Sequence, residues 1–147
     1  MDTSFTERNR AQRERLKQLA ARATEVDLGR PLEGGAWTIS VALAHLAYWD
    51  GRTLATLEAS LRHGLPRAWW DTPEADAVNA ARLPVWLATP PGDALRDAVH
   101  AAEALDRLLE SLAPEVVQAL AGERPFALDR SRHRGSHLDE IERALTS

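Results

Sequence analysis

The longest amphipathic segment of the chain is TISVALAHLAYWDGRTLATLEASLRH, residues 38–63. Thr38 is typical of a helix N-cap. Six apolar residues then recur at helical spacing: Leu43, Leu46, Ala47, Leu54, Leu57 and Leu61. Gly64 follows directly, at a position where helices commonly end. The segment therefore predicts one long helix with a face buried in a core.

Segments on both sides of this helix show the same periodicity. Ser4 and Glu7 have the spacing of a capping box, so we expect a first helix from Ser4 to about Val26. The other expected helices are 74–87, disturbed at Pro84; 93–112, capped by Asp93; a short one from Pro114 to GERP at 122–125; and 129–145. No segment alternates in the manner of a strand. The sequence predicts an all-α fold, a four-helix bundle with an additional short helix before the last helix, as a single domain over 1–147.

Composition excludes several classes of function. A net charge of −4 gives no long-range attraction for nucleic acid or an anionic membrane. The basic residues of 8–22 are interrupted by acidic ones and are interpreted as a solvated helix face. There is no cysteine, so disulfides and thiolate ligands are excluded and a cytoplasmic location is expected. No apolar run reaches the roughly 18–20 residues of a membrane span.

Three histidines are the strongest candidates for a functional site. His133 and His137 are four residues apart, so on a helix both imidazoles project from one face. This spacing allows two nitrogens to bind one ion, with Zn–N distances near ~2.0–2.1 Å. His45 lies on the expected core face of the long helix. A third imidazole from that helix would complete a site that keeps open coordination positions, as catalytic metal sites do.

Each histidine also has an ordinary interpretation. The pair could be solvated beside Arg132 and Arg134, and His45 could be a satisfied core histidine. Their combination favours a metal, because an ionisable group buried without a partner is costly. The sequence contains no HExxH motif, no paired Glu-x-x-His motifs, no Walker A loop and no GxGxxG motif. These absences argue against zincins, di-iron carboxylate bundles and nucleotide-binding folds.

Two motifs resemble the DinB-like superfamily of metal-binding four-helix bundles. WTISVALAHLAYWD at 37–50 resembles the opening of its second helix, and ALDRSRHRGSHLDEIERAL at 127–145 resembles its closing His-x-x-x-His-Leu helix. VNAARLPVWLATPPGDAL at 78–95 is similar to the middle of such proteins. The superfamily includes bacillithiol-dependent transferases and the metal-binding domain of mycothiol-dependent maleylpyruvate isomerase. The isomerases tend to carry glutamate where this chain has His133, so the resemblance is greater to the DinB and transferase branch.

The resemblance implies that His45, His133 and His137 bind one divalent metal ion, zinc or nickel. Three neutral imidazoles leave the ion its full charge as a Lewis acid, able to activate water or a low-molecular-weight thiol. The implied function is a metal-dependent, thiol-dependent S-transferase, or a related hydrolase, acting on a small electrophile. The alternatives are a non-catalytic, stress-related metal- or ligand-binding bundle, and a bundle whose histidines hold no metal.

Two carboxylates have the spacing of partners for the last-helix histidines. Asp129 lies four residues before His133 and could orient its imidazole, or it could cap the last helix. Glu140 lies three residues after His137 and could do the same, or it could pair with Arg143. The sequence leaves both alternatives open.

Aromatic residues near His45 are candidates for the pocket wall. Tyr48, Trp49 and Arg52 follow His45 within two turns, and Arg52 could pair with a substrate carboxylate. Core packing is the alternative for Trp49. Trp69 and Trp70 could cover the pocket or a dimer seam, or simply pack a long loop. We therefore expect a small-molecule substrate and a possible homodimer.

Overall fold

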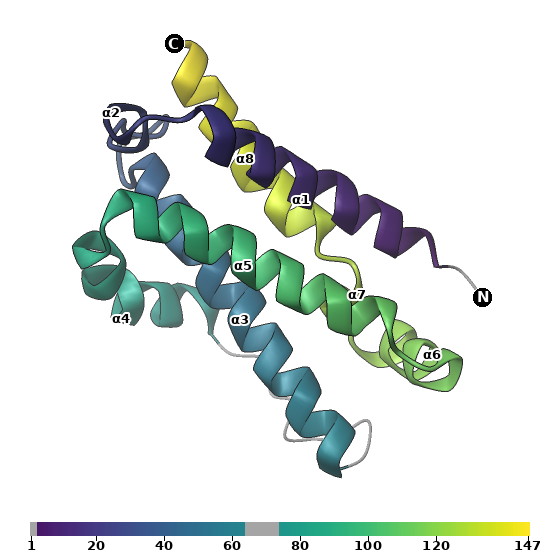
Figure 1. Cartoon of the computed structure of the whole chain (residues 1–147). Coiled ribbons are helices and arrows are strands. Elements are labelled where there is room, and N and C mark those ends of the chain that lie inside the picture. The colour runs from purple at the N-terminus through teal and green to yellow at the C-terminus, as the bar shows by residue number, and fades with distance from the viewer. Residues whose placement is uncertain (1–2, 64–73) are drawn as a thin grey trace.

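The computed structural model describes residues 3–63 and 74–147, and all regular elements in those ranges are helices (Figure 1). They are α1 (Ser4–Arg22), α2 (Glu25–Leu28), α3 (Ile39–His63), α4 (Ala75–Ala88), α5 (Pro91–Glu110), α6 (Pro114–Glu123), α7 (Pro125–Leu128) and α8 (Ser131–Thr146). The predicted all-α class is confirmed. None of these helices is long and apolar enough to span a bilayer. Gly64, Trp69 and Trp70 lie outside the described residues.

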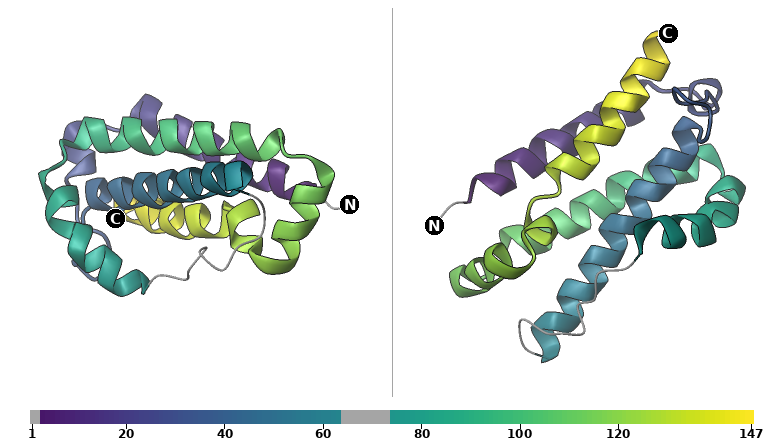
Figure 2. Two further views of the ribbon diagram at one scale, coloured as in Figure 1. Left: turned by 90° about the horizontal axis from the view of Figure 1, so that it is seen from below. Right: turned by 180° about the vertical axis from the view of Figure 1, so that it is seen from behind.

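The four longest helices, α1, α3, α5 and α8, pack side by side. α1 lies against α5 and α8, and α3 lies against the same two helices. α1 and α8 run in one direction, whereas α3 and α5 run in the other (Figures 1 and 2). α4 packs on α3 at the edge of this bundle. The two helices that carry the three histidines, α3 and α8, are therefore antiparallel neighbours.

Buried apolar side chains form two separate clusters in the bundle. The first joins the end of α1 to the starts of α3 and α5 and the end of α8, and includes Leu16, Leu19, Ile39, Leu43, Leu46, Ala98, Ala102, Leu138 and Ile141. The second lies at the opposite end and comprises Phe5, Leu57, Leu105, Leu109, Val117, Leu120, Ala127 and Leu128. Such burial contributes about 25 cal/mol per Å² of apolar surface. A layer of buried polar side chains lies between the two clusters.

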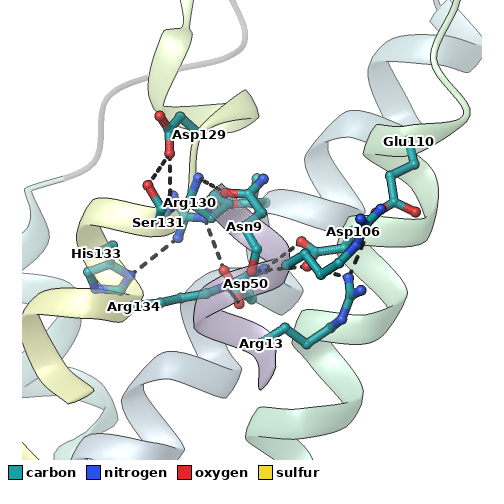
Figure 3. A network of polar contacts seen from close by, with 12 residues as sticks. Asn9, Arg13, Asp50, Asp106, Glu110, Asp129, Arg130, Ser131, His133 and Arg134 are labelled. Atoms are coloured by element: carbon teal, nitrogen blue, oxygen red, sulfur yellow. Dashed lines mark hydrogen bonds and ion pairs between the residues drawn. The ribbon is translucent and has the colours of Figure 1, made fainter. Parts of the chain in front are cut away.

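Arg134 is the centre of that polar layer and is fully buried, with no exposed surface. Its Nε donates to Oδ2 of Asp50 on α3 at 2.8 Å. Its Nη1 and Nη2 donate to the carboxylate of Asp106 on α5, at 3.0 and 2.9 Å. One guanidinium on α8 thus holds buried carboxylates from two other helices (Figure 3).

Two further buried side chains belong to this layer, and the partly buried Arg13 on α1 donates to Asp106 at 2.7 Å from its edge. Arg130 donates from Nε to Oδ1 of Asp50 at 3.0 Å. Asn9 on α1 accepts a hydrogen bond from the backbone N–H of Arg130 at 2.8 Å. We call Asn9, Asp50, Asp106, Arg130 and Arg134 the ion layer. Because each long helix contributes to it, the ion layer links all four (Figure 3).

The first helix differs from the sequence prediction at both ends. The capping box at Ser4 and Glu7 is wrong: Thr3 takes the N-cap position, and Oγ of Ser4 accepts a hydrogen bond from Arg8 at 2.7 Å. The helix ends at Arg22, and Val26 is exposed in α2 rather than buried in α1.

A capping box does form further along, and it explains why the first helix stops early. Thr24 Oγ1 accepts from the backbone N–H of Asp27 at 3.1 Å, and the Asp27 carboxylate accepts from the backbone N–H of Thr24 at 3.0 Å. This reciprocal pair begins a new short helix, α2.

Other predicted helix ends are confirmed or shifted by a few residues. Thr38 caps α3, since its Oγ1 accepts from the backbone N–H of Val41 at 3.2 Å. Asp93 does not cap α5, because that helix already begins at Pro91, a residue suited to the first helical position. Asp93 pairs instead with Arg96 in the first turn. The last helix begins at Ser131 rather than 129.

We predict that Arg134→Met lowers the free energy of unfolding by about 2–3 kcal/mol. The buried carboxylates of Asp50 and Asp106 lose the hydrogen bonds of Arg134, although each keeps one arginine, Arg130 for Asp50 and Arg13 for Asp106. Urea denaturation followed by circular dichroism measures the change. Arg132→Met, on an exposed position of the same helix, is the control and should shift stability by less than about 0.5 kcal/mol. Equal stability of the two variants would show that the ion layer is not needed to hold the helices.

Candidate metal centre

The three histidines converge between α3 and α8. His45, with 4% of its surface exposed, lies on the α3 face that packs against α8. Its ring centroid is 5.0 Å from that of His133 and 4.6 Å from that of His137, and the latter two are 5.0 Å apart. One ring nitrogen from each lies within 4.8 Å of the others. The three side chains are therefore close enough to bind one metal ion.

Burial keeps these imidazoles neutral. It is the largest cause of the lowered pKa of His45, to about 3, and the neighbouring His137 lowers it further. Burial, and then the charge of Arg130, lowers the pKa of His133 to about 2. Burial also lowers the pKa of His137, although Glu140 opposes the shift. Neutral imidazoles have a free lone pair, which is the form that binds metals.

A pocket of about 430 Å³ opens onto the histidines. Its described walls are Trp37, His45, Trp49, Ala75, Asn79, Arg130, His133 and His137. The Trp37 ring lies 4.8 Å from that of His45 and stacks on His137 at 6.2 Å. Trp49 donates from Nε1 to Oδ1 of Asn79 at 2.9 Å, which fixes the indole against α4. The pocket is thus mainly aromatic with a few polar groups, as is usual for small-molecule sites.

The residues expected around His45 divide between two surfaces. Trp49 lines the histidine pocket. Arg52 is not among the described residues of the pocket wall, and its guanidinium lies 5.5 Å from the centre of the Trp49 ring. Tyr48 lies instead in a neighbouring groove between α3, α4 and α5, where the Arg82 guanidinium covers its ring at 4.9 Å. Trp86 separates Tyr48 from the histidine pocket, because its buried ring packs between the two rings, 5.3 Å from that of His45 and 6.0 Å from that of Tyr48.

Of the two carboxylates expected beside the last-helix histidines, only Glu140 lies next to its histidine. Asp129 accepts from Nε of Arg8 at 2.9 Å and from the backbone N–H of Ser131 at 3.0 Å, so it stabilises the start of α8 and does not orient His133. Glu140 does lie beside His137, with Oε1 3.2 Å from Nδ1. That nitrogen has no well-aligned hydrogen bond, so the contact is an ion-pair distance rather than a formed bond.

Four pocket or packing residues were not identified from the sequence: Trp37, Asn79, Trp86 and Arg130. Arg130 could have been found, because it lies three residues before His133 and therefore on the same helical face. Asn79 and Trp86 share a face of α4 at a spacing of seven. Their role depends on how α4 packs on α3, which periodicity alone does not reveal.

Comparison of the chain with models of protein families, with curated proteins and with solved structures finds no match. The chemistry of the site is therefore inferred from its own geometry and from the motifs in the sequence.

We predict that the metal-free protein loses stability as pH falls from about 7 to about 5.5. In the unfolded chain His45, His133 and His137 become protonated near pH ~6.5, whereas their lowered pKa values keep them neutral in the folded protein, so the unfolded state binds more protons in this interval. His45→Leu should reduce the loss by about 1 kcal/mol. The measurement is urea unfolding in chelator at both pH values.

The control is His100→Leu, which changes an exposed histidine on α5 and should keep the wild-type dependence on pH. If the wild type and the His45→Leu variant lost equal amounts of stability between the two pH values, His45 would be protonated in the folded protein.

Proposed function

We propose that His45, His133 and His137 bind one divalent metal ion, zinc or nickel, and that the protein is a metal-dependent enzyme of the DinB-like type. The observation that carries this proposal is the convergence of three neutral imidazoles, one buried and two partly buried, from two antiparallel helices in the wall of an aromatic pocket. The resemblance of residues 37–50 and 127–145 to DinB-like motifs supports it.

The donor set fits such an ion. Three imidazoles suit zinc and nickel, and a set of three leaves coordination positions open. A histidine kept only for packing usually has hydrogen-bond partners at its ring nitrogens. Here Nδ1 of His45 is buried without a partner, and Nε2 of His45 and Nε2 of His133 face each other at 3.0 Å. Three neighbouring imidazoles, two of which meet nitrogen to nitrogen, are explained better by a shared ion than by packing.

A bound divalent ion would supply Lewis-acid chemistry, lowering the pKa of a coordinated water or thiol. The chain itself has no cysteine, so a thiol nucleophile must be a small cosubstrate. Trp37 and Trp49 line the pocket with apolar surface against which an electrophile would pack. Glu140 lies 3.2 Å from Nδ1 of His137, and its carboxylate would have to realign to accept the proton of that nitrogen.

The reaction that fits these parts is transfer of a thiol sulfur to a small electrophile, or the related hydrolysis with water. In the transfer, an S–C bond forms, the bond from that carbon to a leaving group breaks, and the thiol proton is released to solvent. A pocket of about 430 Å³ is of the size that binds a small molecule.

We predict that protein purified without a histidine tag and reconstituted with zinc or nickel binds about one ion per chain. His45→Ala, His133→Ala and His137→Ala should each reduce the metal content strongly, because each removes a ligand. Elemental analysis after gel filtration gives the stoichiometry, and His100→Ala is the control that should retain the ion.

Turnover separates catalysis from simple binding. Loaded wild type should accelerate the reaction of 2-mercaptoethanol with a fluorogenic alkyl bromide, which releases bromide and a proton, and the chelated protein should not. A wild type that binds no ion contradicts the metal site. An ion-loaded protein without thiol transfer or hydrolysis contradicts the enzymatic function and leaves a non-catalytic binding protein.

A further inference from the structure

Arg130 is the cationic side chain among the described residues that line the histidine pocket. It is 6% exposed and belongs to the ion layer. Two of its nitrogens have firm acceptors: Nε donates to Asp50 at 3.0 Å, and Nη1 donates to the backbone oxygen of Phe126 at 3.1 Å. The third, Nη2, lies 3.4 Å from Nδ1 of His133 (Figure 3). The guanidinium is thus anchored at one side and directs its remaining edge toward the histidines.

The contact between Arg130 and His133 depends on the position of the imidazole proton. A guanidinium only donates hydrogen bonds, so Nδ1 of His133 must accept and the ring proton must lie on Nε2. That proton then lies in the 3.0 Å contact with Nε2 of His45. If Nε2 of His133 serves instead as a ligand, the neutral ring carries its proton on Nδ1. Nη2 of Arg130 then meets a donor and requires a different acceptor.

The pocket is the place from which that acceptor can come. Asp50 already receives hydrogen bonds from both Arg130 and Arg134, and the Asn79 carbonyl oxygen receives one from Trp49. A charged donor left without an acceptor in a buried site is costly, and hydrogen bonds between a guanidinium and an anion are among the strongest. An anionic group on the ligand would satisfy Nη2 better than the imidazole nitrogen does.

Resting on the proposed metal site, we propose that Arg130 binds a carboxylate of the substrate through Nη2, so that the substrate class is a small, flat electrophile bearing a carboxylate. The aromatic side chains of Trp37 and Trp49, which line the pocket, suit its flat body. A thiolate would also satisfy the guanidinium, but a thiolate is the softer ligand and is expected on the metal. The carboxylate is therefore assigned to Arg130.

The test uses zinc-loaded protein and the fluorescence of the pocket tryptophans. Benzoate and benzamide have the same shape and differ in charge, and 2-mercaptoethanol supplies a thiol without a carboxylate. Wild type should bind benzoate at least about tenfold more tightly than benzamide. Arg130→Gln should abolish this preference and leave mercaptoethanol binding unchanged, whereas Arg132→Gln, at an exposed position on α8, should retain the preference.

Each result bears on the assignment. Zinc-loaded Arg130→Gln that still prefers benzoate overturns it while leaving the metal site intact, because the zinc alone would then hold the carboxylate. Loss of mercaptoethanol binding in this variant also overturns it, since the anion at Arg130 would be the thiolate. Wild type that binds no zinc removes the proposed function, and this inference with it.

Arg130→Gln can lose its fold, because Arg130 contacts Asp50 in the ion layer. In that event, a crystal structure of zinc-loaded wild type with benzoate decides the question. A carboxylate within hydrogen-bond distance of Nη2 of Arg130 supports the assignment. A carboxylate that contacts the zinc and not Arg130 overturns it.

Discussion

The bridge from Arg134 to Asp50 and Asp106 is the interaction on which the arrangement of the bundle depends. A planar guanidinium offers five donors in fixed directions, so it can bind two carboxylates only when both helices stand in one register relative to α8. An apolar layer of similar volume would often give equal or greater stability, but it would tolerate sliding and rotation of the helices. In this protein the buried ions specify the position of α8 against α3 and α5.

This constraint extends directly to the histidines. Arg130, His133, Arg134 and His137 follow one another at helical spacing and form a continuous polar stripe along the inner face of the first half of α8. Leu138 and Ile141 continue that face as ordinary core. The rotation that places Arg134 between its carboxylates therefore also directs both imidazoles toward His45. Stability and site geometry are set by the same face of one helix.

The sequence was sufficient for the main helices and for singling out the three histidines, because both depend on local periodicity, but it did not predict the short helices α2 and α7. It was misleading where tertiary contacts override local signals. Ser4 and Glu7 have the spacing of a capping box, yet the box that forms joins Thr24 and Asp27 and ends α1 early. Asp129 has the spacing of a partner for His133, yet it binds Arg8 on a helix more than 100 residues away in the chain.

The ion layer could not be inferred from the sequence, because arginines and aspartates in a helix normally face solvent. Only the packing of α1, α3, α5 and α8 shows that Asp50, Asp106 and Arg134 compensate one another. The position of Trp86 between His45 and Tyr48 likewise depends on how α4 crosses α3. Pairing across helices is a property of the folded chain, and single-sequence patterns do not contain it.

X-ray absorption spectroscopy of the zinc-loaded protein tests most directly whether one ion joins α3 to α8. The predicted result is an inner shell that contains three imidazole nitrogens at about 2.0–2.1 Å, with light-atom ligands in the remaining positions. In His45→Ala, the fraction of zinc that still binds should show one imidazole fewer. A shell dominated by carboxylate oxygens, or an imidazole count that does not change in His45→Ala, would contradict a metal centre built from these three histidines.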